Sequence, residues 1–355
     1  MFTFGKKISM RISLIILSAI LFISCGKNTS KDFNSVTIER VFTDSLSIRA
    51  IEPMDVNKVW FAANNGKVGL IDYKTPKLAT IKYEDSLLNF RAISSINNAV
   101  FVLSIENPAV LYKIGFKDNN ATSIEDVYME KGEFVFYDAI KFWDDKEGIA
   151  MGDPINGCLS VLITRDAGNN WTKLSCDILP QTTKGEAAFA ASNSNISVYK
   201  NHVWIVTGGM KARVFYSPDR GVTWEVFETP MIQGKSMTGI YSVDFIDDQT
   251  GVIFGGNWEE QGFNEGNKAI THDGGKTWRL LSNGQGPGYR SSAKFIPGTQ
   301  GKDIVAVGSP GISYSNDGGD SWIELSDEGF YAIEFVNDTL AFASGRNKIS
   351  RLIFK

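Results

Sequence analysis

A turn pattern that occurs four times most constrains how this 355-residue chain can fold. The pattern is Ser/Thr-x-Asp-x-Gly-x-(Thr/Ser/Asn)-Trp, and each copy lies between two short apolar, β-prone runs. The Asp can accept hydrogen bonds from N–H groups of the turn, the Gly can adopt a positive φ, and the Trp offers an apolar face to the next strand. We therefore interpret each copy as a hairpin turn that specifies the fold. Its defining residues are Asp166, Gly168 and Trp171; Asp219, Gly221 and Trp224; Asp273, Gly275 and Trp278; and Asp317, Gly319 and Trp322.

Each turn belongs to a longer unit of four apolar runs, in which the turn separates the third run from the fourth. Unit starts fall near residues 49, 91, 138, 186, 241, 291 and 331, so that the spacings are 42, 47, 48, 55, 50 and 40 residues. Repeats of this length with four strands are typical of propellers. The sequence thus predicts an all-β fold, a seven-bladed β-propeller of four-stranded antiparallel blades. An eight-bladed or open arrangement is the alternative.

The two ends of the repeat region are incomplete. The last unit reaches Lys355 after about three strands, and the β-prone run 36–42 precedes the first unit without a blade of its own. We expect this N-terminal strand to close the ring, because pairing would remove an exposed sheet edge. The predicted propeller therefore covers residues 36–355.

The start of the chain has the pattern of an export signal. Lys6, Lys7 and Arg11 precede the nearly uncharged stretch 12–24, which is short for a membrane span and typical of a signal-peptide core. Ser24 followed by Cys25 resembles a bacterial lipobox. We predict a lipoprotein signal peptide over 1–24, acylation of Cys25, a flexible tether over 25–35, and a lipid-anchored location in a bacterial cell envelope, periplasm-facing or outer-membrane. An ordinary signal peptide with an incidental cysteine is the alternative.

Cys158 and Cys176 flank the first Asp turn. A hairpin centred near residues 167–168 places position 158 opposite 176 or 177, which is close enough for a disulfide. Export to an oxidising compartment would permit this bond. Two unpaired thiols are the alternative.

The composition and the motifs of the sequence argue against several kinds of functional site. The formal charge is −4 and no Lys/Arg-rich run occurs, which argues against a nucleic-acid partner. His202 and His272 are the two histidines of the sequence and lack metal-ligand spacing, so we predict neither a metal site nor a Ser-His-Asp triad. No Gly-x-Gly-x-x-Gly opens a helix after a strand, so no nucleotide cofactor is expected.

The repeated turn resembles the Asp-box, or bacterial neuraminidase repeat, of sialidases and several non-enzymatic propellers. Segments 142–154, 185–192 and 204–215 are similar to bacterial relatives of the plant photosystem II stability/assembly factor. This resemblance implies a propeller fold. The labels oxidoreductase and glycosyl hydrolase-like, which the group often carries, do not establish an activity. The sialidase motif Arg-Ile-Pro is absent, since the chain has Arg91-Ala92-Ile93.

Propeller geometry indicates where a site would lie. The first strand of each blade lines the channel and starts on the face opposite the Asp turns, so the residues near these starts should meet at one mouth. The predicted ligand-binding residues are Arg49, Arg91, Asp138, Asp153, Glu186, Tyr241, Trp258, Arg290 and Tyr331.

We interpret the chain as a monomeric envelope protein that binds a protein or carbohydrate partner at this mouth as an assembly or interaction factor, without catalysis or cofactor. The enzyme alternative is a glycoside hydrolase or lyase with Asp138 and Glu186 as its acid/base pair. A third possibility is that polar residues line the channel only because it is wet.

Overall fold

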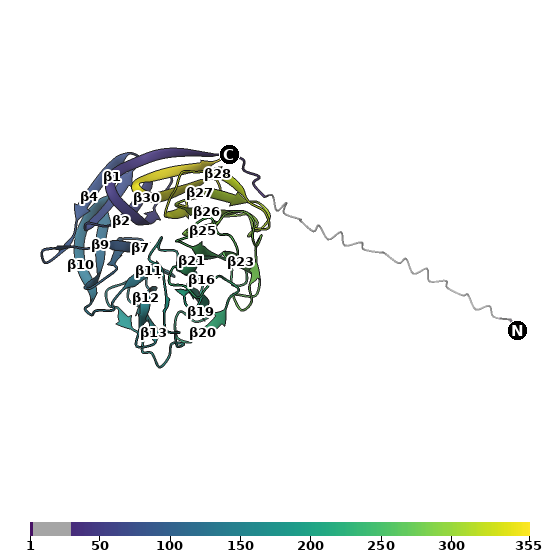
Figure 1. Cartoon of the computed structure of the whole chain (residues 1–355), viewed down its shortest axis with the longest axis horizontal. Coiled ribbons are helices and arrows are strands. Elements are labelled where there is room, and N and C mark those ends of the chain that lie inside the picture. Colours follow the sequence, from purple (N-terminus) through teal and green to yellow (C-terminus); the bar gives the residue numbers. More distant parts are fainter. Residues whose placement is uncertain (3–29) are drawn as a thin grey trace.

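The computed structural model describes residues 1–2 and 30–355 (Figure 1). Residues 3–24 of the predicted signal peptide, Cys25 and residues 26–29 of the predicted tether lie outside the described residues. Residues 30–35 of the tether lie against the propeller: Phe33 is buried in contact with Tyr314 and Phe354. The described residues contain no helix that is both long and apolar enough to span a membrane.

Antiparallel sheets are arranged around a central axis (Figure 1). Four of them have four strands each, in chain order from one edge to the other. Their strands are β7 (Phe90–Ile96), β8 (Ala99–Ser104), β9 (Ala109–Lys117) and β10 (Asn120–Glu130); β11 (Tyr137–Phe142), β12 (Gly148–Ile155), β13 (Cys158–Thr164) and β14 (Thr172–Lys173); β16 (Ile196–Tyr199), β17 (His202–Val206), β19 (Arg213–Ser217) and β20 (Glu225–Glu228); and β25 (Ser292–Phe295), β26 (Ile304–Gly308), β27 (Gly311–Ser315) and β28 (Ile323–Ser326).

Two sheets have six strands. One contains β29 (Ala332–Phe335), β30 (Leu340–Phe354), β1 (Val36–Pro53), β2 (Lys58–Ala63), β3 (Lys67–Asp72) and β4 (Thr75–Thr80) in that order; the other contains β15 (Glu186–Ala187), β18 (Gly208–Gly209), β21 (Thr238–Phe245), β22 (Gly251–Asn257), β23 (Lys268–Thr271) and β24 (Arg279–Leu280). The strands β5 (Lys82–Tyr83) and β6 (Ser86–Leu87) form a separate two-stranded ribbon.

The prediction of seven blades is wrong, because the described strands form six blades. The reason lies in β1, which is one continuous strand of 18 residues. Its first half pairs with β30, as in Val36 opposite Phe354, and its second half pairs with β2, as in Ile48 opposite Ala63. The units expected to be first and last therefore share one sheet, and the run 36–42 is part of that sheet instead of a strand that completes a seventh blade.

The core lies between neighbouring sheets. Inner strands are mostly apolar because both of their faces are covered; every residue of β8 is buried. Aromatic residues join adjacent sheets: the ring of Trp204 in β17 stacks on that of Phe245 in β21, with 3.7 Å between ring centroids.

A buried segment, Ala190–Asn195, fills the centre of the ring. Asn193 donates a hydrogen bond to the carbonyl of Ile93 in β7 and accepts one from the N–H of Ile140 in β11. The Ser192 hydroxyl donates to the carbonyl of Ser291, just before β25. This segment therefore links three sheets and forms a floor beneath the mouth.

Each Asp turn connects the last two strands of its sheet: β13 and β14, β19 and β20, β23 and β24, and β27 and β28. In the third copy the Asp273 carboxylate accepts from the N–H of Thr277 at 2.9 Å and from its hydroxyl at 2.6 Å, while the indole N–H of Trp278 donates to the carbonyl of Gly275. Gly275 has a φ of 90°, in the left-handed region that glycine adopts without strain. In the first copy, the turn follows Thr164 opposite Gly148, at the sheet end away from Tyr137 and Gly152.

Candidate functional site

Four predicted mouth residues lie on β-bulges. The strand register shifts at Arg49 in β1, Arg91 in β7, Asp138 in β11 and Tyr241 in β21. A bulge leaves one residue outside the regular pairing and turns its side chain away from the alternating pattern of the strand. The bulges at Arg91, Asp138 and Tyr241 occur in the first half of their strands, and the one at Arg49 occurs where the part of β1 that pairs with β2 begins. The four residues therefore lie at one end of the ring.

Small residues oppose the bulges across the neighbouring strands. They are Ala63, Ser104, Gly152 and Gly255. A Cβ atom on Gly255 would lie 2.0 Å from the carbonyl oxygen of Gly239, and one on Gly152 would lie 2.2 Å from that of Phe136. Glycine is therefore required at these two positions for the backbones to approach so closely.

Arg49 and Arg91 line a cavity of about 380 Å³ at this mouth. Nη1 of Arg49 donates to the carbonyl of Ala191 at 3.1 Å, and Nη1 of Arg91 donates to that of Ala190 at 3.4 Å. The Arg49 guanidinium also lies 4.2 Å from the centre of the Tyr331 ring. Among the described residues, no carboxylate forms an ion pair with either arginine.

The two positive charges are therefore only partly compensated. Burial and the nearby charge of Arg49 lower the pKa of Arg91, whereas Glu106 and Asp138 act in the opposite direction. Two guanidinium groups above backbone carbonyls, in a concave site, can bind a carboxylate or another anion through charge-assisted hydrogen bonds.

Asp138 and Asp153 differ from ordinary surface carboxylates. Asp138 is fully buried, and neither of its carboxyl oxygens has a hydrogen-bond partner among the described residues. Burial, and then the neighbouring Asp153, raise its pKa well above the usual value, while Arg91 lowers it. Burial also raises the pKa of Asp153 to about 6, although its carboxylate accepts a hydrogen bond from the N–H of Ala188 at 2.8 Å.

Glu186 is engaged in a structural network. Its carboxylate forms an ion pair with Arg213 and accepts a hydrogen bond from Nε of that guanidinium at 3.0 Å. It also accepts hydrogen bonds from the Thr207 hydroxyl at 2.7 Å and from the N–H of Thr183 at 2.8 Å. Because Glu186 is held in this way and Asp138 is buried, the structure does not present the two carboxyls as an acid/base pair facing an open cleft.

Arg290, also predicted for the mouth, is buried elsewhere. Nη2 of its guanidinium donates to both carboxylate oxygens of Glu324, at 3.0 Å each, and to the Ser313 hydroxyl. Burial lowers its pKa, and Glu324 opposes this effect. Arg290 therefore connects the segment that precedes β25 to the outer strand β28, and it is not among the residues that line the cavity.

Tyr241 and Trp258 complete the aromatic side of the cavity. The Tyr241 ring stacks on Phe189, with centroids 4.0 Å apart, and its hydroxyl donates to the carbonyl of Met237. Trp258 is 48% exposed at the rim. Phe136, Phe189, Met237 and Tyr289 also line the cavity and were missed from the sequence. Phe189 belongs to the Gly185–Ser192 segment of the family resemblance, which was the available signal.

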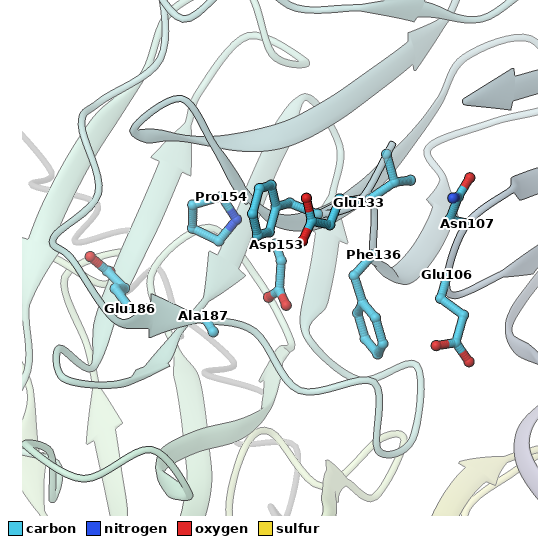
Figure 2. Close-up of a pocket in the computed structure, with 10 residues that line it drawn as sticks. Glu106, Asn107, Glu133, Phe136, Asp153, Pro154, Glu186 and Ala187 are labelled. Carbon is cyan, nitrogen blue, oxygen red and sulfur yellow. The ribbon is translucent and has the colours of Figure 1, made fainter. Parts of the chain in front are cut away.

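A second cavity of about 480 Å³ adjoins the first (Figure 2). The two share Phe136, Asp153 and Ala187 in their walls. Glu106 and Glu133 line the second cavity, and both are exposed. In Figure 2 the Phe136 ring lies between the carboxylates of Asp153 and Glu106.

Cys158 and Cys176 are joined by a disulfide, with 5.5 Å between their Cα atoms. The bond connects the β12–β13 hairpin, which carries Asp153, to the loop that leads to Glu186. No group of three His, Cys, Asp or Glu side chains suited to a metal ion occurs in the part of the chain that the structure describes.

No protein family model and no curated protein sequence matches the chain. Solved structures do match: YCF48 bound to D1 peptide aligns with a TM-score of 0.64 and 17% identity, over 91% of this chain and 98% of that one. YCF48 from Cyanidioschyzon merolae aligns with a TM-score of 0.59 and 14% identity, over 90% and 98%. The WD40 repeats of RRP9 align with a TM-score of 0.60 and 10% identity, over 90% and 98%. At these identities the likeness shows the fold, that of a β-propeller.

Proposed function

We propose that this protein is a binding factor that holds an acidic or C-terminal segment of a partner protein at the Arg49–Arg91 mouth. The observation that carries the proposal is the pair of guanidinium groups, placed by bulges over a cavity and unpaired with any carboxylate of the described residues. Arginine with aromatic residues in a concave site is the composition of a recognition surface. The fold likeness to YCF48 bound to D1 peptide supports a peptide as the ligand.

Hydrolysis at this mouth has weaker support. A glycosidase needs two available carboxyl groups on either side of the scissile bond. Glu186 is committed to Arg213, and Asp138 is fully buried. These contacts favour binding without catalysis by this pair, and a carbohydrate ligand becomes one of the outcomes that the experiment distinguishes.

We also propose that the protein acts in a bacterial cell envelope, anchored through acylated Cys25. The disulfide between Cys158 and Cys176 supports an oxidising compartment. Labelling with a radioactive or alkynyl fatty acid tests the anchor. We expect label in the wild type and none in Cys25→Ser; equal labelling of both proteins would contradict the anchor.

Photo-crosslinking in the native cell tests the binding function. A photoreactive amino acid replaces Trp258 at the mouth or, as a matched control, Val222, which is 61% exposed in the second Asp turn. We expect discrete polypeptide adducts from position 258 that disappear when Arg49→Ala and Arg91→Ala are added, and none from position 222. Equal adducts at both positions, no adduct at 258, or adducts made only of carbohydrate would overturn the proposal.

A further inference from the structure

We propose that the two adjoining cavities form one bipolar groove, whose peptide occupant places a carboxylate at the Arg49–Arg91 end and a lysine or arginine side chain at the Glu106–Glu133 end. This inference rests on the proposed function, because it assumes that the mouth binds a peptide. It adds the charge pattern and the direction of that peptide.

The two cavities are continuous. Phe136, Asp153 and Ala187 belong to the walls of both, and Figure 2 shows Phe136 between Glu106 and Asp153. Glu106 is held near this wall by its backbone, which forms a β-bridge with Phe136. A ligand in the arginine cavity can therefore extend past Phe136 into the second cavity without leaving the surface.

The groove has opposite charges at its two ends. Glu106 and Glu133 form neither an ion pair nor a side-chain hydrogen bond with any described residue, although both line the second cavity. Glu186 also lines it, but Arg213 already neutralises its charge. Asp153 lies in the wall that both cavities share, where it accepts a hydrogen bond from the N–H of Ala188, so it marks neither end. Glu106 and Glu133 therefore define one end, and two guanidinium groups without carboxylate ion pairs define the other.

This arrangement of charges favours a ligand that carries charges of both signs. Opposite charges across an interface favour a complementary partner, and like charges disfavour a wrong one. Glu106 and Glu133 would repel a uniformly acidic segment or an anionic polymer, whereas Arg49 and Arg91 would repel a uniformly basic one. An extended chain with charges of both signs satisfies both ends.

The acidic end of the groove can also hold the methylene groups of a long basic side chain. Phe134, which is 70% exposed, Phe136 and Pro154 line the second cavity beside the glutamates. Lysine and arginine place their methylene stems on apolar surface while their charged ends remain in a polar environment. The acidic cavity thus combines an apolar wall with free carboxylates, as such a side chain requires.

Selection from a library tests the inference. Random ten-residue peptides displayed with free C-termini are selected on wild type, on Glu106→Gln/Glu133→Gln, and on the matched control Glu125→Gln/Glu225→Gln, which changes exposed glutamates of outer strands. We expect wild type and control to enrich peptides with a basic residue at a fixed distance before a carboxylate. The Glu106/Glu133 variant should lose the basic preference and keep the carboxylate.

The enriched peptide, resynthesised, then gives affinities by fluorescence anisotropy. Lys→Gln in the peptide should weaken binding about fivefold to wild type and leave binding to Glu106→Gln/Glu133→Gln unchanged. Amidation of the C-terminus distinguishes a terminal carboxylate from a side-chain one. Carboxylate peptides without any basic preference, or an equal Lys→Gln effect on both proteins, would overturn the bipolar groove while leaving the proposed function intact. The absence of any enriched peptide would overturn both.

Discussion

The pKa values of carboxylates at the two ends of the propeller are shifted in opposite directions. At the Asp-turn end, hydrogen bonds from the Thr277 hydroxyl and N–H outweigh burial and lower the pKa of Asp273. At the mouth, the fully buried Asp138 receives no hydrogen bond from any described residue, and burial raises its pKa. The hydrogen bonds to Asp273 stabilise the fold. Asp138 is left without hydrogen-bond partners, which is common for buried polar groups at ligand-binding sites.

The same contrast exists within the mouth. Glu186 is paired with Arg213, and Arg49 and Arg91 have only backbone carbonyls and an aromatic ring as partners. Position at the mouth is therefore a poor guide to function by itself, because the partners of a side chain decide whether it stabilises the fold or remains available to a ligand.

Glu186→Ala should reduce the free energy of unfolding by about 3–5 kcal/mol, because it leaves the buried Arg213 guanidinium without its counter-charge. Urea denaturation measures this loss, and Glu225→Ala on the exposed surface of β20 is the matched control, with an expected change below about 0.5 kcal/mol. A loss below about 1 kcal/mol for Glu186→Ala together with loss of peptide binding would instead make Glu186 a binding residue.

Cys158→Ser/Cys176→Ser should lower the free energy of unfolding by about 3 kcal/mol, because the disulfide constrains a segment with a sequence separation of 18 residues in the unfolded chain. Reduction of the wild type with dithiothreitol should give a similar shift in urea and none in the double variant. If dithiothreitol leaves the wild-type transition unchanged, the bond does not stabilise the protein.

Asp273→Ala should cost about 2 kcal/mol of folding free energy, because the turn loses charge-assisted hydrogen bonds from Thr277 and the Thr271 hydroxyl. Peptide affinity at the mouth should remain within about twofold of wild type, since the turn lies at the other end of the sheet. Loss of affinity without loss of stability would show that the Asp-turn end also contributes to binding.

Stability should depend on pH with opposite signs at the two ends. The raised pKa of Asp153, about 6, means that its contribution is present below about pH 4 and is lost as the pH rises through about 6. The lowered pKa of Asp273 means that its contribution is present above about pH 4 and is lost as the pH falls.

In urea titrations, the free energy of unfolding of the wild type should decrease by an amount on the order of 1 kcal/mol between pH 4.5 and 7, after allowance for solvent screening, and Asp153→Asn should remove this decrease. An unchanged pH profile would contradict the assignment.

Local chemistry made the hairpins predictable from sequence, because Asp, Gly and Trp recur at the spacing that the turn needs. The blade count failed because β1 continues through the expected boundary near residue 42. Asp44 and Ser45 favour a turn there, but the strand keeps its direction and the register of its pairing with β30 shifts between Thr43 and Ser47. Connectivity alone predicts that the mouth residues meet at the end opposite the Asp turns. The bulges at Arg49 and Asp138 and the pairing of Glu186 with Arg213 depend on contacts between residues far apart in the sequence, and a single sequence does not encode them visibly.

Arg49→Ala/Arg91→Ala tests the central claim, that the mouth arginines serve a ligand and not the fold. The measurement is the free energy of unfolding of the double variant in urea, with Arg279→Ala, an exposed outer-strand arginine, as the matched control. Because Arg91 is partly desolvated and neither arginine has a carboxylate partner among the described residues, we expect a change of no more than about 1 kcal/mol in either direction. A loss of about 3 kcal/mol or more, comparable to that of Glu186→Ala, would show that Arg49 and Arg91 are structural and would contradict the account.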